Sequence, residues 1–264
     1  MAEQANSETV RSSLSNGVLT ITLADQDNRN ALGAELVKGI GEAIDRANDD
    51  DDIRAVVLTN EGTTWCAGAN LKEQSARNES GAATSLGDFP SLLTKIQTSP
   101  TPVIGRIAGH VVGGGNGLAA VCDIAIACDD VKFGFSEVRL GVSPAIVSVV
   151  CLPKMRSGEA MEAFLRGNRF SASKAAEYGL ISRAVSADEL DAAIDEVVSD
   201  LRKGGPNALG VAKRLIYEVP RMEPAAAMAW AAKLSAECFA SDEAREGMRA
   251  FLEKRDAKWI YPAE

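Results

Sequence analysis

The sequence lacks the building blocks of several common kinds of functional site. It has a single histidine, His110, and no GxSxG motif, so it offers neither a histidine-rich metal cluster nor a nucleophile elbow. No run approaches the roughly 18 apolar residues that a membrane span requires. The net charge of −9 provides no basic face for a nucleic-acid backbone. We therefore expect no metal, membrane or nucleic-acid partner, and a structural role for His110.

The cysteines do not form a disulfide framework. Their number, five, is odd, and no two of them share a CxxC spacing. Because no apolar leader segment precedes them, the pattern predicts reduced thiols in a cytoplasmic protein. Cys66 has no basic neighbour that would lower its pKa, so we expect it to be unreactive.

The first two thirds of the chain alternate between strand and helix patterns. Asn16-Gly17 joins two strand-like runs, which is the strongest short hairpin pattern. Apolar residues recur at helical spacing over 33–48. Uninterrupted apolar runs at 55–59 and 124–127 are typical of strands that are covered on both faces. This alternation predicts an α/β core.

The last part of the chain has a helical pattern only, beginning at about residue 186. We therefore predict that residues 1–200 form the α/β core and that residues 201–264 form a helical section. The stretch 76–90 is rich in Ala, Ser, Gly and Asp and ends at a proline, which predicts a long loop that is either functional or disordered.

Two segments with small residues follow predicted strands. Residues 67–69 leave the backbone open to a ligand, and three consecutive glycines at 113–115 begin a predicted helix. Free N–H groups and the positive end of a helix dipole favour an anion at such a place. A tight turn, or close packing of a helix on a strand, would account for the same residues without a ligand. A dinucleotide fingerprint fails, because residue 118 is leucine.

One carboxylate, Glu137, lies in a mostly apolar stretch between Phe133 and Gly141. Such a residue is either a surface charge or a buried acid–base group with a perturbed pKa. The stretch by itself does not decide between the two.

In their order and spacing, these segments resemble the enoyl-CoA hydratase/isomerase (crotonase) family. Residues 67–72 are similar to the family's AGADLK turn, residues 103–123 to its PVIAAVNG…GGG…CD segment, and residues 133–141 to its FG-x-x-E-x-x-x-G segment. Further similar segments are Asn28–Leu32, Arg169–Leu180 and Glu246–Arg255. The resemblance covers roughly residues 10–259.

The resemblance implies an α/β crotonase fold, a superhelix of ββα units with a C-terminal helical trimerisation section. It also implies that the backbone N–H groups of Ala69 and Gly114 stabilise a thioester enolate, with Glu137 as the acid–base residue. Each such donor is typically worth about 3–4 kcal/mol in the transition state. Coenzyme A is part of the acyl-CoA substrate, so no separate cofactor is expected. The expected coenzyme A contacts are Arg29, Ala31, Ala67, Ala69, Asn70, Leu71, Lys72 and Gly114.

The sequence departs from the family pattern at two positions. Family hydratases commonly carry a first glutamate where this chain has Gly117, and a second where it has Glu137. The family's aspartate after the AGA turn is Asn70 here, which forms hydrogen bonds but carries no charge. The stretch 136–146 resembles methylglutaconyl-CoA-type hydratases, a branch that also tends to have glycine at the first position.

Three functions follow from a single glutamate. Glu137 could hydrate a 2-enoyl-CoA, which the likeness to the methylglutaconyl-type branch favours. It could instead move a proton between two acyl carbons, as the Δ3,Δ2-enoyl-CoA isomerases do. The third alternative is a non-catalytic homologue that binds acyl-CoA.

The C-terminal helices carry apolar faces that a single domain could hardly bury, with Phe239, Met248, Phe251 and Leu252 among their residues. Family members associate through this region, so the resemblance implies a homotrimer or a hexamer. The alternative is that these side chains pack on the core of their own chain.

Overall fold

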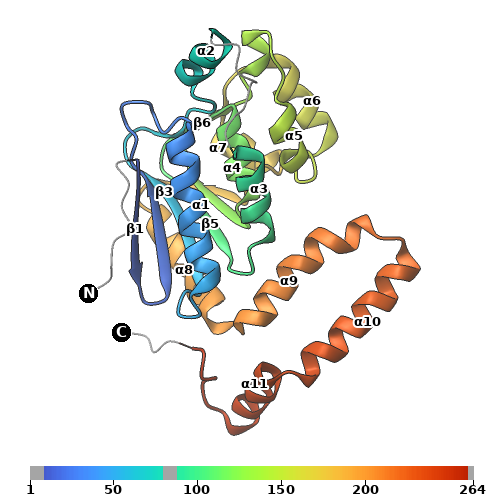
Figure 1. Cartoon of the computed structure of the whole chain (residues 1–264). Helices are drawn as coiled ribbons and strands as arrows, with labels where there is room; N and C mark the ends of the chain where they lie inside the picture. The colour runs from blue at the N-terminus through green and yellow to red at the C-terminus, as the bar shows by residue number, and fades with distance from the viewer. Residues whose placement is uncertain (1–8, 80–87, 261–264) are drawn as a thin grey trace.

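The computed structural model describes residues 9–79 and 88–260 and contains two β-sheets flanked by helices (Figure 1). The larger sheet has six strands in the order β1-β2-β3-β5-β7-β10, in which β1 and β2 are antiparallel and the other neighbours parallel. Its strands are β1 (Val10–Ser15), β2 (Val18–Leu23), β3 (Ala55–Asn60), β5 (Val103–Ile107), β7 (Ile124–Cys128) and β10 (Arg183–Val185).

The smaller sheet has four short strands in the order β4-β6-β8-β9. They are β4 (Thr64–Cys66), β6 (His110–Val112), β8 (Lys132–Gly134) and β9 (Phe170–Ser171). The first three are parallel neighbours, and β9 is antiparallel to β8.

The helices connect the strands and form the C-terminal part of the chain. Up to the last strand they are α1 (Ala34–Asp49), α2 (Leu71–Glu79), α3 (Phe89–Thr98), α4 (Gly114–Val121), α5 (Ala145–Cys151), α6 (Ser157–Arg166) and α7 (Ala172–Glu177), with a 3₁₀ turn η1 (Glu137–Leu140). After it come α8 (Leu190–Lys203), α9 (Pro206–Glu218), a 3₁₀ turn η2 (Val219–Arg221), α10 (Pro224–Ala240) and α11 (Asp242–Glu253).

The chain passes repeatedly from the larger sheet to the smaller one. Strand β3 is followed by β4, β5 by β6, and β7 by β8. Because β4, β6 and β8 run parallel, their carboxyl ends lie at the same edge of the smaller sheet. The residues that follow these strands, 67–69, 113–114 and 135–137, are therefore brought together from three distant parts of the sequence.

The core lies between the larger sheet and its helices. Residues 55–58 of β3 are all buried, as the uninterrupted apolar run predicted for a strand covered on both faces. Helix α1 packs on the sheet through a stripe that includes Leu36, Ile40 and Ile44, each at most 1% exposed. The predicted hairpin is also confirmed, since Asn16 and Gly17 both have positive φ and β1 pairs with β2.

The prediction of a loop over 76–90 is wrong at both ends. Helix α2 continues to Glu79, and α3 begins at Phe89, while residues 80–87 lie outside the described ranges. Pro90 occupies the first turn of α3, where a proline costs no hydrogen bond, so it marks the start of a helix. Leu92 and Ile96, one helical turn apart, bury the apolar face of α3.

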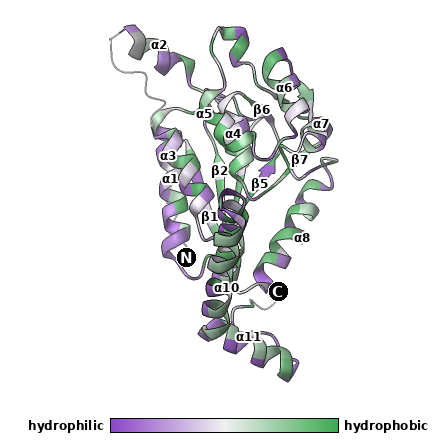
Figure 2. Cartoon of the chain, turned by 90° about the vertical axis from the view of Figure 1, so that its right-hand side faces the viewer, coloured by the Kyte–Doolittle hydropathy of each residue, from purple (hydrophilic) through white to green (hydrophobic). Residues whose placement is uncertain are grey.

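Helices α9, α10 and α11 extend away from the two sheets (Figures 1 and 2). Phe239, Phe251 and Leu252 are 67%, 83% and 79% exposed, so the alternative that they pack on the core of their own chain is wrong. No helix in the described part of the chain is long and apolar enough to cross a membrane.

A buried ion pair attaches this helical section to the core. Lys213 of α9 lies 2.8 Å from the Asp123 carboxylate, and its ammonium also donates to the carbonyl of Ile96 at 2.8 Å. The two side chains are 8% and 18% exposed. Asp123 in turn accepts a hydrogen bond from the backbone N–H of Val103, so the pair holds α9 against the start of β5.

We expect Lys213→Met to destabilise the protein by roughly 3 kcal/mol or more, because it leaves the Asp123 carboxylate buried without its cation. Urea denaturation followed by circular dichroism measures the change. The matched control is Lys203→Met, which removes a pair with Asp200 whose side chains are 62% and 72% exposed, and should cost less than about 1 kcal/mol. Equal midpoints for the two variants would contradict the anchoring role.

Candidate active site

The turn that follows β4 presents a backbone N–H without a protein acceptor. Segment 29–32 runs beside it, so that Ala67 donates to Arg29 O at 3.2 Å and Leu32 donates to Gly68 O at 2.7 Å. Leu32 and Ala69 thereby form a parallel bridge, in which the N–H of residue 69 points away from its neighbour. Among the described residues, nothing accepts a hydrogen bond from the N–H of Ala69.

A second free N–H lies at the start of α4. Gly113 has φ +55° and ψ −125°, a conformation open to glycine, and Gly114 is the first residue of the helix. The first N–H groups of a helix have no partner within it. The N–H of Gly114 has no acceptor elsewhere in the described part of the chain either.

The two turns are in direct contact because both consist of small residues. A Cβ atom added to Gly68, whose φ is +85°, would lie 3.0 Å from Gly114 N and 2.8 Å from Val112 O. No side chain fits there without separating the two turns. The structure therefore places the N–H groups predicted to form an oxyanion hole on two adjoining backbone segments.

The Glu137 carboxyl lies beside the same turns. A Cβ on Gly113 would be 3.5 Å from Glu137 Oε1. The side chain is half-buried, and its Oε2 atom is inaccessible and has no hydrogen-bond partner among the described residues. Burial raises the pKa of Glu137 above the ordinary glutamate value. Of the two sequence alternatives, a surface charge is wrong, because the carboxyl group is partly buried, while its role as an acid–base group stays a prediction.

Aromatic packing fixes the segment that carries Glu137. Phe133, which lies in β8, and Phe135, which directly follows this strand, are fully buried. The Phe135 ring lies 4.3 Å from the Phe164 ring of α6, and the Phe133 ring lies 6.2 Å from Phe170 of β9. Gly141, with φ +75°, then ends the 3₁₀ turn that begins at Glu137.

Seven of the eight predicted coenzyme A contacts lie on the two joined segments 29–32 and 67–72, and the eighth, Gly114, is the first residue of α4. Arg29 and Lys72 are exposed, and Lys72 Nζ lies 3.4 Å from the side-chain oxygen of Asn28. Leu71 is 57% exposed, whereas Ala31 is buried. All eight predicted residues are thus on, or adjoin, the edge at which the strands of the smaller sheet end.

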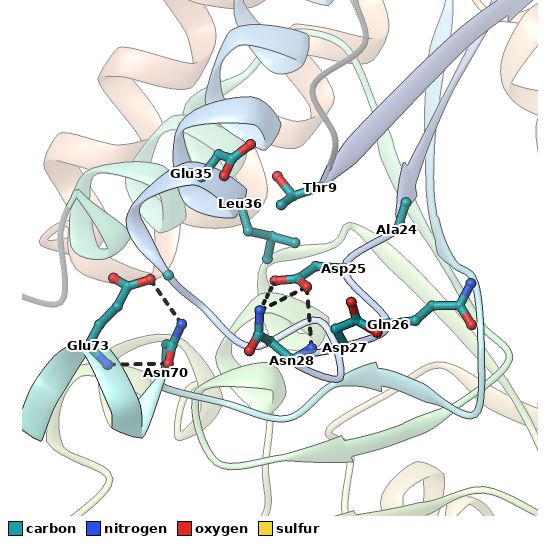
Figure 3. A pocket seen from close by; sticks show the side chains of 11 residues that line it. Thr9, Ala24, Asp25, Gln26, Asp27, Asn28, Glu35, Leu36, Asn70 and Glu73 are labelled. Atoms are coloured by element: carbon teal, nitrogen blue, oxygen red, sulfur yellow. Dashed lines mark hydrogen bonds between the residues drawn. The ribbon is translucent and has the colours of Figure 1, made fainter.

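A polar pocket lies next to the turn that follows β4 (Figure 3). The hydrogen bonds of its lining residues explain why residue 70 is an amide. Asn70 donates to Glu73 Oε1 at 2.9 Å, and the other oxygen of Glu73 accepts from the N–H of Ala34 at the start of α1 at 3.2 Å. An aspartate at 70 would place two carboxylates in contact, so the uncharged residue suits this chain. Asp25, Asp27 and Glu35 add three further carboxylates to the pocket lining, which makes it unsuitable for a phosphate.

The space into which a side chain at position 117 would extend is already filled by another residue. A Cβ atom on Gly117 would lie 2.5 Å from Val147 Cγ1 and 3.0 Å from Val147 Cβ. Val147 belongs to α5 and is 3% exposed, so α5 packs closely on α4 through this glycine. A glutamate at 117 would require α5 to move away. Sequence analysis did not anticipate the role of Val147, because nothing in the sequence indicates which helix covers Gly117.

The remaining candidates have structural roles. His110 accepts a hydrogen bond at Nδ1 from the backbone N–H of Lys132, which joins β6 to β8. Cys66 is fully buried, and burial raises the pKa of its thiol to about 12, which agrees with the expectation of an unreactive thiol. All five cysteines are free. No group of three or more potential metal ligands occurs within residues 9–79 and 88–260.

Comparison with known proteins identifies the family and the fold of the chain. The family model described as enoyl-CoA hydratase/isomerase matches residues 13–261, and the chain belongs to that family. Similar curated proteins include the probable enoyl-CoA hydratase echA8 of Mycobacterium bovis, 31% identical over 91% of this chain and 93% of that protein. Another is the crotonyl-CoA hydratase of Syntrophomonas wolfei, 30% identical over 88% of this chain and 90% of that protein.

Solved structures show the same fold. AtuE of Pseudomonas aeruginosa superimposes with a TM-score of 0.89 at 32% identity, covering 96% of this chain and all (100%) of that one. An enoyl-CoA hydratase of Mycobacterium smegmatis gives a TM-score of 0.87 at 31% identity over 95% and 98% of the two chains. The predicted crotonase fold is confirmed.

The raised pKa of Glu137 has a consequence for stability. Between about 4.3, the pKa of an unperturbed glutamate, and the raised value, the folded protein holds a proton that the unfolded chain has released. The contribution of this group to stability therefore falls as the pH rises through that window. Glu137→Gln removes the charge at every pH. The free energy of unfolding of this variant, relative to that of the wild type, should therefore increase from pH 4 to pH 7. Urea denaturation at both values measures this.

The control for this comparison is Glu42→Gln, at an exposed glutamate on α1. Its effect on stability should be small at both pH values. If the effect of Glu137→Gln did not change between pH 4 and pH 7, the pKa of Glu137 would not be raised in the folded protein.

Proposed function

We propose that this protein is an enoyl-CoA hydratase, which adds water across the 2,3 double bond of an enoyl-CoA thioester. The observation that carries the proposal is the contact between two turns with free backbone N–H groups, at Ala69 and Gly114, beside the carboxyl group of Glu137. Relatives of similar length named as enoyl-CoA hydratases support the same conclusion.

The chemistry follows from where charge develops. As a water oxygen bonds to the β-carbon of the substrate, electrons move onto the thioester oxygen. Two N–H groups aimed at that oxygen stabilise the enolate, and they need no reorganisation because the backbone already holds them. Glu137 accepts a proton from the attacking water and returns a proton to the α-carbon, which yields the 3-hydroxyacyl thioester. A pKa raised toward neutrality suits a group that both accepts and donates a proton.

Isomerisation is the second candidate, and the contact between Gly117 and Val147 favours it. Because a Val147 methyl group occupies the place where a side chain at 117 would begin, no carboxylate from α4 assists Glu137 in holding water. Moving a proton between two carbons requires one base and no water. The resemblance of the stretch around Glu137 to methylglutaconyl-CoA-type hydratases, which tend to share the glycine, supports hydration.

The charge distribution also indicates where the coenzyme A part of the substrate binds. We propose that Arg29 and Lys72, both exposed next to the first turn, contact its phosphates. The carboxylates of the adjoining pocket would repel phosphates. Ala31, Ala67, Asn70 and Leu71 complete the proposed contact surface. Apart from the coenzyme A of the substrate, no cofactor or metal is part of this proposal.

We further propose that residues 201–264 form an oligomerisation section, that the protein is a homotrimer or hexamer, and that it is cytoplasmic. The large apolar side chains exposed on α10 and α11 support association, because they form no part of the core of their own chain. The five free cysteines support a reducing compartment.

Glu137→Gln should reduce turnover by about 10²- to 10⁴-fold, since the amide cannot act as a general acid or base. Parallel absorbance assays with crotonyl-CoA, 3-methylglutaconyl-CoA and a 3-enoyl-CoA measure it, and calorimetry with a saturated acyl-CoA measures binding. Binding should stay within a few-fold of wild type. If the wild-type protein were active on the 3-enoyl substrate alone, isomerisation would replace hydration as the proposed function. If the wild-type protein and the variant bound the acyl-CoA equally and the wild type had no activity, the protein would be a non-catalytic homologue.

Light scattering coupled to gel filtration should give three or six times the chain mass of 27.8 kDa. Phe251→Asp, at a position that is 83% exposed in the single chain, should shift the distribution toward smaller species, because burying its carboxylate in an interface is costly. Lys38→Asp, on the exposed face of α1, is the control and should leave the mass unchanged. A monomeric wild-type protein would refute the oligomer.

A further inference from the structure

Asn116 is a completely buried polar residue in an otherwise apolar or glycine-containing helix. It lies in the first turn of α4 with 0% exposure. Its side-chain nitrogen donates to two backbone carbonyls, Gly113 O at 3.0 Å and Gly134 O at 2.9 Å. Its side-chain oxygen is buried and has no partner among the described residues. A leucine at this position would leave no buried acceptor unpaired, so the amide requires an explanation.

The two carbonyls define what Asn116 holds. The Gly113 carbonyl belongs to the same planar peptide unit as the N–H of Gly114, and in a trans peptide the C=O and N–H bonds point in opposite directions. Because the side-chain amide of Asn116 holds this carbonyl on one side of the peptide unit, the Gly114 N–H points to the opposite side. The backbone N–H of Asn116 also donates to Gly113 O at 3.0 Å, so this oxygen accepts two bonds from one residue. Such restraint is needed because Gly113 has φ +55° and no side chain to limit it.

The second carbonyl belongs to the strand that leads to Glu137. Gly134 is the last residue of β8, three positions before Glu137, and its oxygen accepts from Asn116 and from the backbone N–H of Gly113 at 2.9 Å. One amide group thus connects the turn that presents the Gly114 N–H to the segment that presents the carboxyl group. The amide orientation is determined, because the opposite one would place its oxygen against two carbonyl oxygens.

We propose that Asn116 is a positioning residue that aims the N–H of Gly114 at the thioester oxygen and fixes its distance from Glu137. The inference rests on the proposed function, in which that N–H stabilises an enolate. Asn116 touches neither substrate nor reacting atoms in this role. It acts through the peptide unit between Gly113 and Gly114 and through the carbonyl of Gly134.

Two substitutions test the role. In Asn116→Ser, the new side chain is smaller than the amide, so it fits the same space, but it is too short to reach both carbonyls. Asn116→Asp keeps the shape and replaces the donor by a second acceptor. In both, kcat should fall by about 10- to 100-fold, somewhat less than the loss typical of deleting an oxyanion donor. KM should stay within a few-fold, because seven of the eight predicted acyl-CoA contacts, on segments 29–32 and 67–72, are untouched.

Acetoacetyl-CoA supplies a readout that a purely structural role would not change. As a 1,3-dicarbonyl thioester it can form an enolate, which absorbs in the near ultraviolet, and we expect the enolate fraction of the bound compound to depend on the N–H donors without any turnover. We expect the difference spectrum to be strong for wild type and to weaken for both variants in proportion to their kcat. Thr101→Val is the control, because it also deletes a buried hydrogen bond, from Thr101 Oγ1 to Ala47 O at 3.0 Å, and lies in the connection between α3 and β5, outside the turns that follow β4, β6 and β8. It should lower the melting temperature and leave the spectrum unchanged.

The outcomes separate the inference from the proposed function. Folded Asn116 variants that keep the wild-type kcat and enolate spectrum would overturn the positioning role while leaving the hydratase proposal intact. A wild-type protein with neither turnover nor an enolate spectrum would overturn the proposed function itself. If one variant does not fold, the spectrum of the other decides.

Discussion

The parallel pairing of β4, β6 and β8 is the constraint on which the site depends. Each strand has only three residues, yet their alignment brings three carboxyl ends to one edge of the smaller sheet. The turns after the first two strands meet so closely that Gly68 admits no Cβ atom. Their contact fixes the relative placement of two backbone donors, and the third strand leads to Glu137. The relative placement of the two N–H groups and the Glu137 carboxyl group thus depends on how β4, β6 and β8 are aligned.

Such a site costs stability. It contains two N–H groups and a buried amide oxygen that have no partner among the described residues, and a carboxyl group whose charge burial disfavours. Each would be corrected in a sequence selected for stability alone. Within the described ranges the core offsets these costs, since the central strands are buried on both faces. The same packing removes the space for a second carboxylate, because α5 lies against α4 at Gly117.

Much of the fold was predictable, because local patterns report local structure. The hairpin at Asn16-Gly17 follows from backbone preferences of those two residues, and α1 follows from the spacing of its apolar side chains. The prediction failed where composition replaced periodicity as the guide. Over 76–90 small and polar residues suggested a loop, although Leu92 and Ile96 beyond Pro90 already showed the spacing of a helix.

For the site, the sequence by itself determined the kinds of residue available. It supplied small residues where two backbones would approach, one carboxylate in an apolar stretch, and a single histidine, which is too few for a histidine-rich metal cluster. Only the tertiary structure decided which atoms meet. That Val147 fills the space beside Gly117, and that Asn116 joins Gly113 to Gly134, depends on contacts between residues 18 to 30 positions apart. Periodicity describes neighbours along one element, whereas these contacts arise from how helices and strands pack on one another.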